Sequence, residues 1–502
     1  MHTSSHLCSV RPLSQVSRWQ KLASASSALF GLTLSLTVLA PAQAEAGTAA
    51  VIVQPQLAEF IQQNPTGTLF VYLRERADVD VYQKLSSIPE RRRAVVKALQ
   101  ETASRSQKGL AQELTRRGMP YTSYYVVNAL QVPANTALVE WLKTRPEVER
   151  IDANRSFLML DHPVEERNVS AVAAGVEWNV TAIKAPTVWL MGYTGKGIVV
   201  AGADTGVDWT HSAIKKQYRG YSAASGGATH AYNWYDGTTR ARQDAPYDDH
   251  GHGTFTVGEM VGDDGNGNQI GAAPGATWIA CKNMNSSGVG TVESYTRCFQ
   301  WFIAPTDSTG QNPNPELAPD VVNNSWGCPS SEGCTKETLH DIVKNVQAAG
   351  VMLIFSAGNS GPSCSTVMDP PATFPEVMSV GAVDSSGSIA SFSSRGPTTY
   401  DRSLKPNISA PGQGVRSCMP GGGYSSMSGT SMAAPLVAAG IALVWSADPV
   451  LKGDISTTWT TLTNTATAKR APKCGGEGAA NNIYGYGNLN VKAAVDAALA
   501  TP

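Results

Sequence analysis

Short apolar runs that alternate with helical stretches, from Val176 to near the C-terminus, constrain the fold of this chain more than any other feature. Continuous β-branched and other apolar residues predict buried strands at 198–202, 277–281, 321–324, 351–355 and 377–383. Helices are predicted after several of these strands, as at 292–302 and 336–349. Such alternation forms right-handed crossovers and a parallel sheet. We therefore predict an α/β fold in three layers, a parallel sheet with helices on both faces and a site at the carboxyl ends of its strands.

Residues 66–156 form a separate unit that is rich in Arg and Lys. Its pattern predicts a small α+β domain, with strands at 68–73, 123–132 and 148–152 and helices at 88–114 and 135–144. Pro133 and Asn135 mark the start of the second helix. The following residues, 157–175, are polar, small and flexible, and they predict an exposed junction of the kind that proteases cut.

The first 44 residues are typical of a signal peptide. Basic residues precede a short apolar run at 28–39, and Ala42 and Ala44 supply the small residues that a signal peptidase reads. The alternative is a membrane anchor, but a span needs about 20 apolar residues and this run is shorter. We expect a secreted protein without a stable membrane anchor, extracellular or, in a host with an outer membrane, periplasmic.

The net charge limits the possible partners of the chain, and its cysteine content fits a secreted protein. The 502 residues carry a net charge of −1, which argues against a nucleic-acid partner. Seven of the eight cysteines lie between Cys281 and Cys474, and an oxidising compartment allows up to three disulfides with one cysteine left over. Candidate pairs are Cys328 with Cys334 and Cys281 with Cys298, whereas the sequence does not pair Cys364, Cys418 and Cys474.

Three segments carry a carboxylate, an imidazole and a hydroxyl, at Asp204, His252 and Ser431. Each residue alone has an ordinary structural explanation, such as a helix cap for the serine. Together they fit nucleophilic catalysis, because a serine hydroxyl needs an adjacent base. His252 would take and return the proton, and Asp204 would hold the imidazole tautomer and stabilise the imidazolium.

These three segments resemble the active-site motifs of the subtilisin-like serine peptidases, in the same chain order. The resemblance extends from Val176 to the C-terminus, and segments 176–180 and 319–327 point to one member of the family in particular. It implies that Asn359 donates to the oxyanion and that the substrate is bound by Ser325, Trp326 and Gly327. The bulky aromatic ring of Trp326 favours a role as an apolar pocket wall. By composition alone, Asn359 would be a turn residue.

The resemblance also implies an organisation and an activity. We expect a signal peptide at 1–44, an inhibitory propeptide at 45–160, a cleavable junction at 161–175 and a catalytic domain at 176–502. The expected enzyme is a monomeric serine endopeptidase that cleaves proteins and peptides, with the propeptide as its intramolecular inhibitor and its removal autocatalytic. The alternative for the N-terminal domain is a permanent substrate-binding domain.

The motifs leave two alternatives, the identity of the catalytic base and the presence of structural calcium. The family places its base immediately before Gly-Thr, which selects His252 and leaves His250 at the rim. The chemistry needs no cofactor, and structural calcium is left open: Ala213 stands where the family has an aspartate ligand. The loop 263–268 carries oxygen ligands but fits a solvated turn equally well, so no metal ligand is assigned.

Rival functions explain the sequence less well. An α/β-hydrolase esterase expects Gly-x-Ser-x-Gly and the order Ser, Asp, His, whereas here Ala433 fills the fifth position and the serine comes last. A catalytically dead binding module would have lost a triad or oxyanion residue, and all four are present. A secreted structural or adhesion protein leaves the Gly-rich motifs unexplained.

Overall fold

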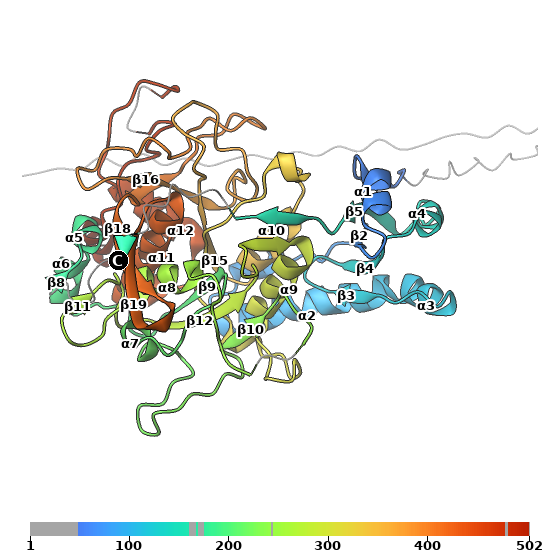
Figure 1. The fold of residues 1–502 in the computed structure, drawn as a ribbon, viewed down its shortest axis with the longest axis horizontal. Helices are drawn as coiled ribbons and strands as arrows, with labels where there is room; N and C mark the ends of the chain where they lie inside the picture. The colour runs from blue at the N-terminus through green and yellow to red at the C-terminus, as the bar shows by residue number, and fades with distance from the viewer. Residues whose placement is uncertain (1–48, 160–166, 169–174, 242–243, 477–479, 501–502) are drawn as a thin grey trace, which may run out of the picture. The chain divides into compact units, whose positions relative to one another are not determined.

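The computed structural model of the chain describes residues 49–159, 167–168, 175–241, 244–476 and 480–500. The predicted signal peptide and most of the junction lie outside the described residues. Residues 49–502 form one compact unit, which contains a large sheet and a smaller one (Figure 1).

The large sheet has seven parallel strands, as expected for the α/β class. In spatial order they are β10 (Trp234–Asp236), β12 (Thr277–Lys282), β9 (Val199–Asp204), β14 (Val321–Asn324), β15 (Met352–Ser356), β16 (Met378–Val383) and β17 (Ile408–Pro411). The five predicted strands are the inner five. Both edge strands were missed, because they are short and lack a continuous apolar run.

Successive residues of a strand face opposite sides of the sheet, so each strand contributes to two cores. Val200 lies in the core covered by α8 (His252–Val261), α11 (Thr430–Ala447) and α13 (Val491–Ala500). The next residue, Ala201, lies in the opposite core, under α9 (Val292–Ile303) and α10 (His340–Ala348). This alternation gives the predicted three layers.

The long helix α11 is apolar all round, which is typical of a buried helix. Among the described residues it is the one helix long and apolar enough to cross a membrane, and 89% of it is buried inside the protein. It packs against β14, β15, β16 and β17. It is therefore the core helix of the large domain.

The smaller sheet belongs to the N-terminal domain and has the order β1 (Ile52–Val53), β5 (Val148–Ala153), β2 (Thr68–Leu73), β4 (Ala129–Pro133), β3 (Thr122–Tyr124). Its helices are α1 (Leu57–Gln63), α2 (Ile88–Ser106), α3 (Lys108–Arg116) and α4 (Thr136–Leu142). Asn135 caps α4 by accepting the Leu138 N–H (2.9 Å), at the predicted start.

Two predictions for this domain were wrong in detail. The helix predicted at 88–114 is two helices, interrupted at Gln107, whose amide donates to the Asn128 side chain (3.0 Å). The strand predicted at 123–132 is a hairpin, because Asn128 adopts a left-handed conformation (φ 47°) at its turn. The two positions contact each other, and no hydrophobic pattern reports such a polar contact.

Short strand pairs and helices complete the fold. The pairs are β6 (Ser156–Leu158) with β13 (Val289–Thr291), β7 (Arg167–Asn168) with β19 (Gly423–Met427) beside β18 (Val415–Met419), and β8 (Gly175–Val176) with β11 (Asn268–Gln269). The remaining helices are α5 (Trp178–Ala182), α6 (Ala185–Leu190), α7 (Ser212–Lys215) and α12 (Ile455–Thr465).

Three disulfides are present among the described residues, and both candidate pairs are confirmed. The third bond joins Cys364 to Cys474, across 110 residues. Cys418 is a buried free thiol, and burial raises its pKa to about 12.

Candidate active site

Asp204 is the last residue of β9, at the carboxyl edge of the sheet. Its Oδ1 lies 2.7 Å from Nδ1 of His252 and also accepts the Thr205 N–H (2.7 Å). The Thr256 hydroxyl donates to Oδ2 (3.3 Å). Both oxygens of the Asp204 carboxylate thus accept hydrogen bonds, and Oδ1 is directed at the imidazole.

His252 is the first residue of α8, and 2% of its side chain is exposed. Gly253 lets α8 approach the turn after β9, since a Cβ there would collide with the Gly206 carbonyl. The other histidine of the motif, His250, is exposed, with its ring centroid 6.4 Å from that of His252. Desolvation and the adjacent His252 lower the pKa of His250. The structure thus pairs His252, and not His250, with Asp204.

Ser431 lies in the first turn of α11 and is fully buried. Its hydroxyl donates to the Ser325 carbonyl (3.3 Å), and the Ser325 hydroxyl donates back to the Ser431 carbonyl (2.9 Å). The N-terminus of this 18-residue helix favours negative charge. The serine therefore lies beside the segment that follows β14.

Asn359 follows β15 and contacts the residue that precedes Ser431. Its Oδ1 accepts both the N–H and the hydroxyl of Thr430 (2.9 Å each). Because the amide oxygen is engaged there, the NH2 end is directed to the other side. That orientation suits a donor for an oxyanion.

The predicted substrate-binding segment is placed differently from the expectation for Trp326. This ring is buried: its Nε1 donates to the Ala203 carbonyl (3.1 Å), and it stacks on Tyr295 with 4.0 Å between centroids. Ser325 holds Ser431, and Gly327 is buried beside them. Trp326 therefore supports the site from within the core, and its ring does not line a surface pocket.

A strand that an extended segment of the N-terminal domain occupies is β13, which the motifs did not single out. It pairs antiparallel with β6, in the register Phe157 opposite Gly290, and the Met159 N–H donates to the Gly288 carbonyl (2.8 Å). The Phe157 ring is buried and stacks on Tyr295 at 5.9 Å. The glycines at 288 and 290 were the available signal, since a Cβ at Gly290 would collide with the Tyr295 hydroxyl.

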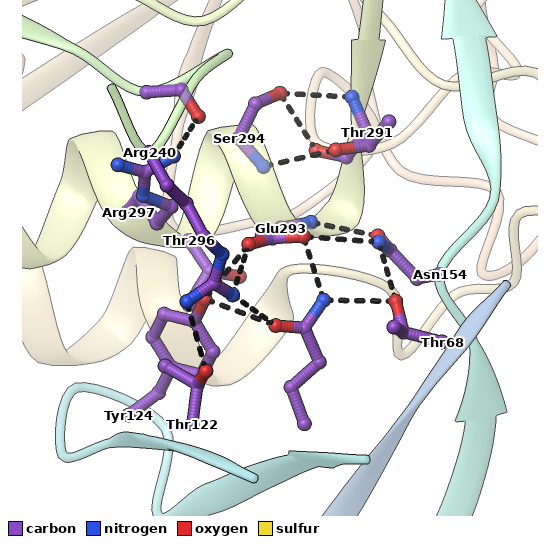
Figure 2. A network of polar contacts seen from close by, with 12 residues as sticks. Thr68, Thr122, Tyr124, Asn154, Arg240, Thr291, Glu293, Ser294, Thr296 and Arg297 are labelled. Carbon is purple, nitrogen blue, oxygen red and sulfur yellow. Dashed lines mark hydrogen bonds and ion pairs between the residues drawn. The ribbon is translucent and has the colours of Figure 1, made fainter. Parts of the chain in front are cut away.

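A polar network at the start of α9 joins the N-terminal domain to the large domain (Figure 2). Thr291 caps the helix, and Asn154 of the N-terminal domain accepts the Glu293 N–H in its first turn (2.9 Å). The Glu293 carboxylate accepts from Gln131 on one oxygen and from Arg240 on the other (2.6 Å each). Two side chains of the N-terminal domain thus complete a helix N-terminus that belongs to the large domain.

Comparison with known proteins assigns the family. The subtilase family model matches residues 195–487. Bacillopeptidase F of Bacillus subtilis (strain 168) is 40% identical over 429 residues, which is 81% of this chain and 29% of that protein. Subtilisin E of the same strain is 30% identical over 378 residues, 75% of this chain and 83% of that protein. Alkaline protease of Shouchella clausii is 30% identical over 352 residues, 69% and 77% respectively.

The segments at 176–180 and 319–327 had pointed to bacillopeptidase F, and its 40% identity confirms that resemblance. The chain spans less than a third of the length of bacillopeptidase F, but most of the length of subtilisin E. The chain therefore belongs to the subtilase family of serine endopeptidases.

Proposed function

We propose that this chain hydrolyses peptide bonds in proteins through an acyl-enzyme on Ser431. The 2.7 Å contact between Asp204 and His252 carries the proposal, because it fixes the imidazole tautomer that a general base needs. His252 takes the Ser431 proton as the hydroxyl attacks the substrate carbonyl, and returns it to the leaving amine. Water then hydrolyses the ester by the same route.

The charge that forms on the substrate oxygen needs donors. The Asn359 NH2 group and the Ser431 backbone N–H, at the N-terminus of α11, would supply them. The Thr430 contacts that fix the Asn359 amide exist before substrate arrives. This preorganisation supports the role, since the donors need not move as charge develops.

The N-terminal domain is proposed to be the intramolecular inhibitor. Its last strand, β6, occupies the edge β13, where an extended substrate would add by the same main-chain hydrogen bonds. A second contact supports this role: the Arg92 guanidinium on α2 pairs with the buried Asp320 carboxylate (2.9 Å) and donates to the Ala318 carbonyl (3.0 Å). A permanent substrate-binding domain would leave β13 accessible to substrate.

The first substrate is proposed to be the chain itself. The strand that enters the edge runs through Phe157 and Met159 toward the junction, most of which lies outside the described residues. We propose cleavage within this junction and, from the signal peptide that the sequence predicts at 1–44, secretion of the product. Cleavage there would separate the inhibitor from a catalytic domain that begins near Val176.

The test is to express the precursor and its Ser431→Ala variant in a protease-free system. We expect the parent to lose its N-terminal domain and the variant to retain it, with N-terminal sequencing of the product placing the cut between residues 160 and 175. Equal loss from both proteins would exclude self-processing. A fluorophosphonate should label the parent and not the variant, and label on the variant would exclude Ser431 as nucleophile.

A further inference from the structure

We propose that two internal side-chain cations, Lys405 and Arg416, take the place of structural metal ions, so that the folded chain does not depend on calcium. Two groups of backbone and side-chain oxygens carry the proposal. One surrounds Lys405 near the entries of β16 and β17, and the other is the loop 263–268 with its neighbours. In both, protein N–H groups donate to oxygens of the kind that a calcium ion takes.

Lys405 is 1% exposed. Its Nζ donates to the carbonyls of Phe374 and Val377 (2.7 Å each) and to Oδ1 of Asn407 (3.0 Å). Burial lowers the pKa of Lys405 to about 7, but three acceptors require three N–H donors, which only the ammonium has. The charged form therefore fits this cage.

The cage ties two strand entries together. Phe374 and Val377 precede β16, whereas Asn407 directly precedes β17 and also accepts the Ser379 N–H (2.9 Å). Carbonyl and amide oxygens are the hard ligands that calcium takes in proteins. Here a covalently attached ammonium gathers them, so the cation cannot dissociate.

In the loop 263–268, where family resemblance left calcium open, one carboxylate oxygen and the backbone carbonyl of each aspartate already accept hydrogen bonds. Oδ1 of Asp263 accepts the Gly265 N–H (2.8 Å), and Oδ1 of Asp264 accepts the loop N–H groups at 266 and 268 (2.7 and 3.2 Å). Lys216 donates its ammonium to the Asp264 carbonyl (3.2 Å), and Gln217 donates to the Asp263 carbonyl (3.3 Å).

Arg416 on β18 supplies the second internal cation, and it is 8% exposed. Its Nη1 donates to Oδ1 of Asn268 (2.9 Å) and to Oε1 of Glu177 (2.8 Å), and its guanidinium lies over the Tyr424 ring at 4.3 Å. Glu177 follows β8, which pairs with β11 at the end of the loop. Arg416 thus fastens the first strand of the large domain to the loop.

These contacts do not fit a calcium ion. Calcium takes six to eight oxygens, and no group of three or more His, Cys, Asp or Glu side chains is gathered for a metal in the described part of the chain. Ala213 contributes a methyl group and only its carbonyl, which accepts the Asp263 N–H (2.7 Å). A divalent ion in this loop would also face the Lys216 ammonium.

The first test is the unfolding temperature of the full-length Ser431→Ala protein, in which self-digestion is prevented. It is measured by calorimetry with excess EDTA and with excess calcium chloride, at one ionic strength. We expect the two temperatures to agree within about 1 °C. A fall of several degrees on chelation would show a structural metal ion and overturn the proposal.

The second test removes the ammonium. Lys405→Ala leaves three inward-facing oxygens, so we expect a lower unfolding temperature that sodium or potassium chloride partly restores, compared with choline chloride at equal ionic strength. The exposed Lys97→Ala is the matched control and should behave as the parent. An unchanged unfolding temperature, or equal responses to all three salts, would overturn the role of Lys405.

If Lys405→Ala does not fold, Arg416→Gln decides the matter. Gln keeps a hydrogen-bond donor but removes the charge that faces Glu177. We expect a lower unfolding temperature for Arg416→Gln in EDTA and a gain on adding calcium that the parent does not show. A parent that itself gains from calcium would contradict the inference.

Discussion

Thr430 shows how one residue can orient a catalytic candidate without touching substrate. Both of its donors point at the oxygen of Asn359 and so decide which end of that amide faces away. The sequence predicted Asn359 through its motif but could not predict this orientation. The partner lies 71 residues away, and only the packing of α11 beside β15 brings it close.

Replacing Asn359 by Ala should lower kcat by about 10²–10³ with little change in KM, the size seen when subtilisin loses such a donor. The reason is that the amide would act on the oxyanion and not on the bound substrate. Steady-state kinetics on one peptide substrate measures both constants. Thr430→Val is the control for orientation: it keeps the N–H, so its loss should be smaller. A raised KM with unchanged kcat would contradict the assignment.

Glu259 is a residue whose importance the sequence did not reveal, because it reads as one more position of a helix. Its side chain is fully buried in α8, and neither carboxylate oxygen has a partner in the described structure. Burial raises the pKa of this carboxyl well above its ordinary value. The folded protein therefore retains a proton that the unfolded chain releases above about pH 4.5.

The raised pKa of Glu259 makes the stability of the folded protein depend on pH. Because the folded state binds more protons, its stability falls as the pH rises from the unfolded pKa toward the raised folded value. Glu259→Gln removes this titration, so its advantage in unfolding temperature over the parent should grow from pH 5 to pH 8. Calorimetry in the Ser431→Ala background measures both profiles. Profiles that stay parallel would show that Glu259 does not titrate in this range.

At the scale of elements, the pairing of β6 with β13 explains why the Trp326 ring does not line a surface pocket. The motif placed an aromatic residue beside the serine, and an aromatic ring there was expected to line a pocket. In the structure Tyr295 on α9 lies between Trp326 and Phe157, so Tyr295 makes the contact and Trp326 supports it. Ring order of this kind depends on how α9 packs, which no motif encodes.

If β6 inhibits the enzyme as proposed, Phe157 should be its main anchor. Its ring is buried, and truncating such a ring costs about 3–5 kcal/mol, an upper limit for the docking energy lost. We expect Phe157→Ala to release active enzyme earlier during maturation, measured as the lag before peptide hydrolysis begins. Leu158→Ala is the matched control, because that neighbour is 47% exposed. Equal lags for the two variants would show that the contact between the Phe157 and Tyr295 rings does not hold the strand.

At the scale of the whole molecule, the N-terminal domain shares a core with the catalytic domain. Phe70 and Val95 belong to the same apolar cluster as α9 and α10, while the other face of the small sheet has a core of its own. The sequence predicted two domains and the parallel sheet, because hydrophobic periodicity reports local structure. It could not predict this shared cluster, which depends on surfaces far apart in the chain.

The third disulfide, Cys364–Cys474, also joins residues far apart in the chain, and the sequence did not predict it. The lengths of the loops that the disulfides close rank their expected contributions to the free energy of unfolding. Cys364–Cys474 spans 110 residues and Cys328–Cys334 spans 6, so loop-closure entropy predicts losses of about 5 and about 2 kcal/mol when each is replaced by two serines. Denaturant unfolding in the Ser431→Ala background measures both losses, with Cys418→Ser as the control that removes a thiol but no bond. A larger loss for the short loop would show that native-state strain, not chain entropy, dominates.

Ser431 is the second residue of α11, and α11 is the helix at the centre of the larger core. Local fraying at the surface leaves such a residue in place, so it is lost only when the core itself opens. When self-digestion is prevented, the working life of the proposed enzyme should therefore equal the lifetime of its folded state. Heat, detergent and storage would reduce the number of active molecules without producing a slower enzyme, and residual activity would serve as a direct count of folded protein.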